Sequence, residues 1–200
     1  MTSEALLAAE RRGIRRCDQP SQCLAANHPQ LVQSFAAIET ALPGFGMELL
    51  ADVAHGGMWH IGFLAAPGIP GMLLAGRERE FLAGYALPAM CGTQGAISER
   101  DIDEFSRVYS RPDGLRGTAG SYGSMLAEGN EITELVARRQ LRMPVLAIDG
   151  GTGDFTRDTM GQVAADVTTV KVDGVGHLVA IEAPEALAAV LLGFYRPLDG

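Results

Sequence analysis

The chain has 200 residues, of which 47% are hydrophobic, and it carries a formal net charge of −8. This length suits one domain or one core with an inserted subdomain, and the hydrophobic share is large enough to build a core. Because no basic cluster is present, we expect no nucleic-acid partner. No stretch is apolar for long enough to cross a bilayer, so we also expect no membrane partner.

The three cysteines, Cys17, Cys23 and Cys91, lack the spacing of a disulfide framework or of a zinc site. The N-terminal segment has acidic and basic residues mixed into a short apolar stretch, which is unlike a signal peptide. Together these features predict a cytoplasmic protein.

The first 23 residues are poorly patterned, apart from a short helix that Ser3 could cap. A helix then ends at Pro29, which cannot continue it, and residues 32–38 are predicted to form a buried strand. Residues 47 to about 140 are predicted to be mainly helical. Within them, Ser98 and Asp101 stand at capping-box spacing, which places a helix start at Ser98.

The C-terminal part alternates between strand and helix patterns. Residues 143–148 form a continuous apolar run, typical of a strand buried on both faces of a parallel sheet. A helix over 156–165, a β-branched strand over 168–172 and a helix from Pro184 to about Tyr195 follow. This order predicts an α/β fold with a mainly parallel sheet. The helical block between its strands is expected to cover the sheet's carboxyl edge, where open α/β sheets bind ligands.

Several side chains suited to acid–base chemistry follow the predicted strands at that edge. His177 lies in a glycine-flanked turn, and the carboxylates are Glu39, Asp149 and Asp154. A carboxylate beside an imidazole fixes its tautomer and stabilises the imidazolium, which is the orienting role in a catalytic triad. A buried carboxylate–histidine pair with a purely structural role is the alternative.

Eight short pieces follow one another in a recognisable order and spacing. They are residues 26–29 (ANHP), 39–44 (ETALPG), 59–63 (WHIGF), 76–79 (GRER), 111–116 (RPDGLR), 144–148 (PVLAI), 174–177 (GVGH) and 182–185 (EAPE). In these pieces, from about Leu24 to the C-terminus, the chain resembles the α/β-hydrolase superfamily. The resemblance is to the branch of epoxide hydrolases and haloalkane or haloacetate dehalogenases.

This resemblance implies a partial α/β-hydrolase fold with an inserted helical cap. Residues 24–48 and 141–200 would belong to the core, residues 49–140 to the cap, and residues 1–23 to an atypical N-terminal segment. It implies that His177 is the general base that activates water. The triad acid follows one of two strands in this superfamily, and we favour Glu39 over Asp154 and rank Asp149 last.

The resemblance also places Trp59, His60 and Tyr122 at cap positions near the substrate. Their side chains can donate hydrogen bonds, as needed to polarise an epoxide oxygen or to hold a leaving halide. Packing within the cap is the alternative role for Trp59. Gly123 follows Tyr122 where the family commonly has arginine.

The family's nucleophile turn, G-x-D-x-G or G-x-S-x-G, is absent from the sequence. It should precede the helix that ends at His28, and Cys17 and Asp18 in that region lack flanking glycines. We expect no metal, because His55 and His60 are off the spacing of a helical metal pair. We expect no cofactor either, since residues 150–153 lack the ending of a phosphate-binding loop.

Three hypotheses therefore remain open. The first is a hydrolase of the epoxide hydrolase or haloacetate dehalogenase type that acts on a small molecule through an ester intermediate. A serine-type esterase is the runner-up. The third is a non-enzymatic remnant. In all three cases the resemblance implies an N-terminally truncated hydrolase, whose exposed sheet edge would favour self-association.

Overall fold

Three parallel strands form the sheet of this protein in a computed structural model that describes residues 20–151 and 153–196. They are β1 (Phe35–Ile38), β2 (Val145–Asp149) and β3 (Val167–Lys171), in the spatial order β1-β2-β3. Ile38 lies opposite Ile148, which lies opposite Val170, so all three strands end at the same edge. The predicted α/β class with a parallel sheet is confirmed. Expectations for Ser3, Cys17 and Asp18 lie outside the described residues.

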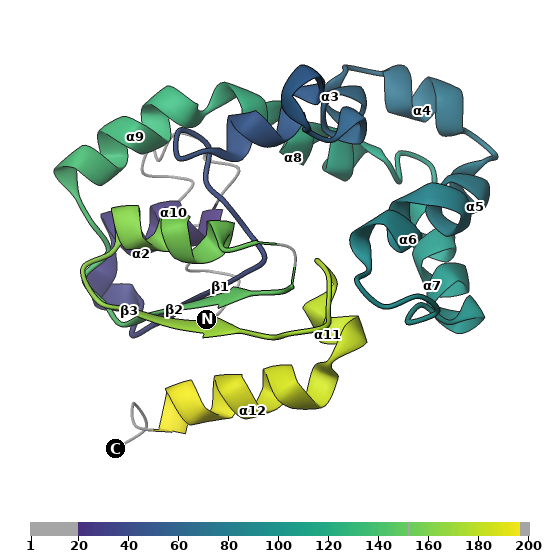
Figure 1. The fold of residues 1–200 in the computed structure, drawn as a ribbon. Coiled ribbons are helices and arrows are strands. Elements are labelled where there is room, and N and C mark those ends of the chain that lie inside the picture. The colour runs from purple at the N-terminus through teal and green to yellow at the C-terminus, as the bar shows by residue number, and fades with distance from the viewer. Residues whose placement is uncertain (1–19, 152, 197–200) are drawn as a thin grey trace.

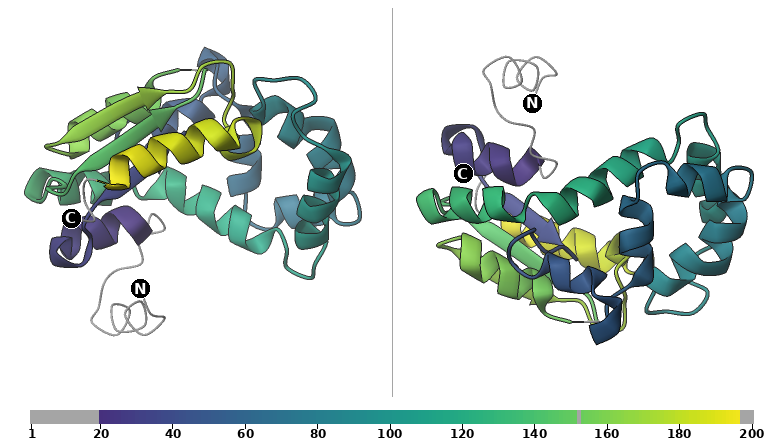
Figure 2. Two further views of the ribbon diagram at one scale, coloured as in Figure 1. Left: turned by 90° about the horizontal axis from the view of Figure 1, so that it is seen from below. Right: turned by 90° about the horizontal axis from the view of Figure 1, so that it is seen from above.

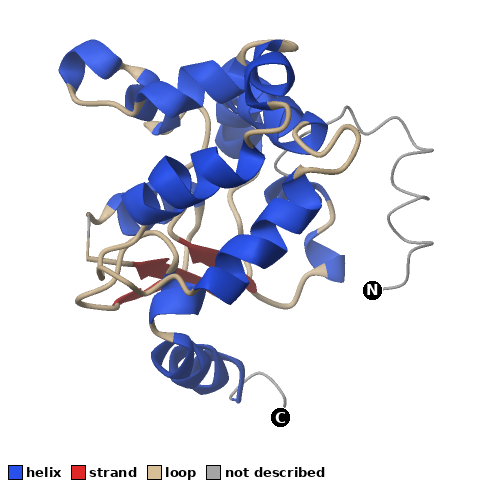
Figure 3. Ribbon diagram, turned by 90° about the vertical axis from the view of Figure 1, so that its right-hand side faces the viewer, coloured by secondary structure: helices blue, strands red, loops and turns tan. Residues whose placement is uncertain are grey.

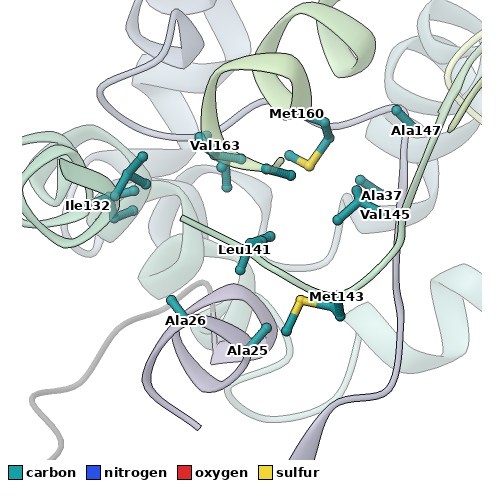
Figure 4. Close-up of a cluster of buried hydrophobic side chains, with 13 residues drawn as sticks. Ala25, Ala26, Ala37, Ile132, Leu141, Met143, Val145, Ala147, Met160 and Val163 are labelled. Atoms are coloured by element: carbon teal, nitrogen blue, oxygen red, sulfur yellow. The ribbon is translucent and has the colours of Figure 1, made fainter. Parts of the chain in front are cut away.

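Strand β2 is the centre of the core. All five of its residues are buried, which confirms the strand predicted from the continuous apolar run. Because successive side chains point to opposite faces, Val145 and Ala147 join one hydrophobic cluster and Leu146 and Ile148 join another. Figure 4 shows the first cluster, in which α2, α9 and α10 pack on the sheet. Helices α11 and α12 pack on the second face.

Helices surround this short sheet, as Figure 3 shows in blue and red. Around the core they are α2 (Pro20–Asn27), η1 (Pro29–Leu31), α9 (Gly129–Arg138), α10 (Phe155–Val163), α11 (Val179–Glu182) and α12 (Pro184–Tyr195). Those between β1 and α9 are η2 (Met47–Ala51), η3 (Val53–His55), α3 (Trp59–Ala65), α4 (Ile69–Leu74), α5 (Glu78–Phe81), the π-helical η4 (Leu82–Ala86), α6 (Leu87–Met90), α7 (Glu99–Tyr109) and α8 (Arg116–Ala127).

The helices from α3 to α7 lie on the side of the sheet where the strands end (Figures 1 and 2). A separate hydrophobic cluster around Leu82, Leu87 and Ile102 packs η4, α6 and α7 together, and Leu178, next to His177 in the chain, packs against it. By contrast, α9 packs on the sheet through its buried residues. The exact division into core and cap segments stays a prediction.

The predicted capping box at the start of α7 is confirmed. The Ser98 hydroxyl accepts the Asp101 backbone N–H, and the Asp101 carboxylate accepts the Ser98 backbone N–H. Strand β1 begins at Phe35, three residues later than the sequence indicated. Its length follows from pairing, since Phe35 is the first residue opposite β2.

Cys23 and Cys91 differ in their oxidation state. Cys23 is disulfide-bonded and Cys91 carries a free thiol. Count and spacing did not predict a disulfide, because they carry no information about which sulfur atoms the fold brings within bonding distance. The cytoplasmic location stays a prediction. None of the helices in the described parts of the chain is long and apolar enough to cross a membrane.

Candidate active site

His177 lies in the turn that connects β3 to α11. The turn needs a glycine at Gly174, whose φ is +78°, a left-handed conformation that glycine adopts without strain. Buried Val172 and Val175 anchor the turn in the core beneath the second face of the sheet. The backbone N–H of His177 donates to the carbonyl of Met90 at 2.7 Å. Its side chain is 50% exposed, so the imidazole is held at the surface of the carboxyl edge.

Glu39 follows β1 directly and points into the same edge. Its backbone N–H continues the sheet ladder by donating to Ile148, while its φ of +46° is left-handed and uncommon for a non-glycine residue. The side chain is 2% exposed, and its Oε1 accepts the backbone N–H of Gly150. A Cβ on Gly150 would lie 2.5 Å from the carbonyl oxygen of Gly176, so close approach of these loops requires glycine there.

The second Glu39 oxygen, Oε2, lies 3.4 Å from Nδ1 of His177. This is an ion-pair distance, but the contact is not aligned as a hydrogen bond, and Oε2 is buried without a donor. A buried carboxylate oxygen without a donor is costly. A small rotation of the half-exposed imidazole would satisfy it, and catalytic hydrogen bonds are often long in unliganded enzymes. The arrangement therefore suits a carboxylate that orients an imidazole.

The other two predicted carboxylates are occupied elsewhere. Asp154 forms ion pairs with Lys171 at 3.0 Å and Arg157 at 3.1 Å. The Lys171 hydrogen bond holds the pKa of Asp154 below its usual range. Asp149 is buried and accepts the backbone N–H groups of Thr156 and Arg157, the first turn of α10. Such contacts stabilise a helix N-terminus. Of the three candidates, the structure brings Glu39 to His177.

The predicted cap residues lie together with one tyrosine that the sequence did not single out. His60 Nδ1 is 3.2 Å from the Tyr85 hydroxyl, and the Trp59 and Tyr85 rings are 4.8 Å apart between centroids. The His60 and Tyr122 rings contact edge to face at 6.5 Å. Tyr85 stands four residues after Phe81, a spacing that puts both rings on one helical face. Because both residues lie in the block predicted to be mainly helical, that spacing could have identified Tyr85.

Electrostatics connect this group to the Glu39–His177 pair. Burial lowers the pKa of His60, and the charge of nearby His177 lowers it further. Burial raises the pKa of Tyr122, with a smaller contribution from Tyr109. At neutral pH, a neutral imidazole and a protonated phenol can therefore both donate hydrogen bonds. Trp59 is 47% exposed and also packs against the rings of Phe63 and Tyr85, so its role stays a prediction.

Within residues 20–151 and 153–196, no three His, Cys, Asp or Glu side chains come together in a way that could hold a metal ion. The region in which the family pattern places its nucleophile, around residues 10–20, falls almost entirely outside the described residues. The sequence itself contains no G-x-D-x-G or G-x-S-x-G there. The described site thus consists of an imidazole, a buried carboxylate that faces it and a group of side chains that can donate hydrogen bonds.

Comparisons with known proteins identify chains that are similar to this one in sequence and in fold. The soluble epoxide hydrolase of Corynebacterium sp. (strain C12) is 35% identical over 104 residues, which are 51% of this chain and 36% of that protein. The structure of Cfl2 from Burkholderia cenocepacia matches with a TM-score of 0.77 and 28% identity, covering 96% of this chain and 70% of Cfl2. The epoxide hydrolase CorEH matches with a TM-score of 0.75 and 24% identity, covering 90% and 65%.

No protein-family model matches the chain. The chain spans about a third of the length of the soluble epoxide hydrolase and about two thirds of the length of the two solved structures. The chain therefore has part of the α/β-hydrolase fold and is similar to the epoxide-hydrolase-like branch of that superfamily.

Proposed function

We propose that this chain carries the water-activating and oxygen-binding parts of a hydrolase of the epoxide hydrolase or haloacetate dehalogenase type. The observation that supports this most is the buried Glu39 carboxylate facing His177 at 3.4 Å, at the edge where the strands end. In this proposal Glu39 orients His177, and His177 removes a proton from the water that hydrolyses an ester intermediate.

The hydrogen-bond donors around His60 suit the other half of such chemistry. Opening an epoxide leaves an alkoxide, which must be stabilised as its charge develops. Trp59, His60 and Tyr122 can donate hydrogen bonds to that oxygen or to a leaving halide, and Tyr85 positions His60 through its hydroxyl. The substrate in this proposal is a small epoxide or haloacid.

The ester intermediate requires a carboxylate nucleophile, which no motif of this sequence supplies. Losing the nucleophile of a triad enzyme costs about a millionfold in kcat. The missing motif is the specific observation that favours the second candidate, a non-enzymatic remnant of a hydrolase. A serine-type esterase remains the alternative enzyme.

The test is turnover of an aryl epoxide, of fluoroacetate and of a p-nitrophenyl ester by the purified chain. We expect epoxide or haloacid hydrolysis that falls by about 100-fold or more in His177→Ala and Glu39→Gln. His55→Ala is the matched control, because His55 is exposed and paired with Asp52 away from Glu39. Turnover of the ester alone would favour the esterase, and no His177-dependent turnover of any substrate would favour the remnant.

A further inference from the structure

The chain segment that follows α6 lies directly against the turn that holds His177. The carbonyl of Met90 accepts the His177 N–H at 2.7 Å, and the Thr93 hydroxyl donates to the carbonyl of Gly174 at 3.0 Å. A Cβ on Gly92 would lie 2.5 Å from the Val175 carbonyl carbon, so the two backbones touch. The helical region beyond the sheet therefore meets the candidate base through main-chain contacts.

One carboxylate joins these two segments. Oε2 of Glu182, at the end of α11, accepts the backbone N–H groups of Gly92 and Thr93, each at 2.8 Å. Its Oε1 accepts the N–H of Gly176, also at 2.8 Å, immediately before His177. Hydrogen bonds to an ionised carboxylate are about twice as strong as neutral ones. Burial raises the pKa of Cys91, and the charge of Glu182 raises it further, which is consistent with a negative charge beside this segment.

We propose that Glu182 is a positioning residue for His177. By holding the Gly176 N–H on one oxygen and the Gly92 and Thr93 N–H groups on the other, it sets where the His177 backbone sits relative to Glu39. The same bonds make the position of the base depend on the position of the segment after α6. This inference rests on the role proposed for His177, but its test does not require turnover.

Glu182→Gln is the informative variant because it keeps the size of the side chain. The glutamine amide offers one acceptor oxygen and places an NH₂ donor where a second acceptor is needed, so at least one backbone N–H loses its partner. Glu185→Gln is the matched control, since Glu185 is exposed at the start of α12. Thr93→Val is a second test of the same junction, because Thr93 is exposed and its hydroxyl bond to Gly174 is lost without removing a charge.

The readout is the ¹H–¹⁵N spectrum of the imidazoles in protein labelled with ¹⁵N-histidine, which has four histidines. His177→Gln assigns the His177 signals. We expect Glu182→Gln to shift the His177 signals toward a mixture of tautomers, with the His28 signals unchanged. We expect a smaller shift in the same direction for Thr93→Val and none for Glu185→Gln. If the enzyme turns over a substrate, kcat should fall by about 100-fold with KM little changed.

Unchanged His177 signals in folded Glu182→Gln would overturn the proposal. So would a shift of His28 as large as that of His177, since Glu182 would then support the whole fold. If Glu182→Gln does not fold, Thr93→Val decides, and unchanged His177 signals there would also overturn the proposal. A chain without turnover in which His177 still responds to Glu182 would contradict the proposed function and leave the positioning role standing.

Discussion

The Glu39–His177 pair combines a carboxylate removed from water with an imidazole that water can reach. Because Glu39 is buried, water has little access to its carboxylate. The charge of the carboxylate therefore acts mainly on the groups that face it. One oxygen is held by Gly150, and the other faces Nδ1 of His177. The opposite imidazole nitrogen is then the one available to a water molecule. This division of roles is what general-base chemistry requires of the pair.

Among the single residues, we expect His60 to make the stability of the protein depend on pH. Its folded pKa lies below the ordinary value of about 6.5, mainly because burial disfavours the imidazolium. As the pH falls below about 6.5, the unfolded chain therefore binds the proton first, and stability is lost. His60→Gln removes this effect. We expect the free energy of unfolding in urea to fall more steeply for the wild type than for His60→Gln between about pH 7.5 and pH 5.5. Equal slopes would contradict the lowered pKa.

Among the elements, α7 depends on its capping box. Ser98 and Asp101 satisfy each other's backbone N–H groups at the first turn, and Arg79 ties this helix to α5 through Glu99 and Asp103. The ion pairs are exposed, and such pairs contribute little. The capping box therefore contributes more than these ion pairs to the stability of the first turn of the helix.

We expect Ser98→Ala to lower the free energy of unfolding by about 1 kcal/mol, because the Asp101 N–H loses its acceptor. Urea unfolding monitored by circular dichroism measures the change. Ser121→Ala, at an exposed serine within α8, is the control and should change stability by less than about 0.5 kcal/mol. A loss as large in the control as in Ser98→Ala would show that the capping box is not the cause.

At the scale of the whole molecule, two features matter: the sheet is short, and the chain carries a net charge of −8. In the described residues β1 pairs only with β2, so its other edge lacks a strand partner, and unpaired edges promote association. Repulsion between like-charged copies opposes this and weakens as the pH approaches the pI of about 5.0. Self-association stays a proposal, and it should be pH-dependent.

Sedimentation velocity tests this expectation. The sedimentation coefficient should rise with protein concentration, and more steeply at about pH 5.5 than at about pH 8, where self-repulsion is stronger. A single species of 21.1 kDa at both pH values and at all concentrations would contradict it.

Local patterns in the sequence determined the class of the fold and many of its elements. The apolar run of β2, the capping box of α7 and the Pro184 start of α12 are short-range signals, and each element forms where its signal lies. The sequence also identified His177 and placed Glu39 among its candidate partners, because the ends of parallel strands share one edge. The catalytic roles of these residues stay predictions.

Only the tertiary structure decided which carboxylate faces His177. Glu39 and Asp154 both follow strands, but the register of the sheet directs Glu39 toward Nδ1, while Lys171 and Arg157 hold Asp154. Tyr85 likewise meets His60, and Glu182 meets Gly92 and Thr93, through contacts between segments far apart in the chain. Such contacts depend on how strands pair and helices pack, which no local pattern encodes.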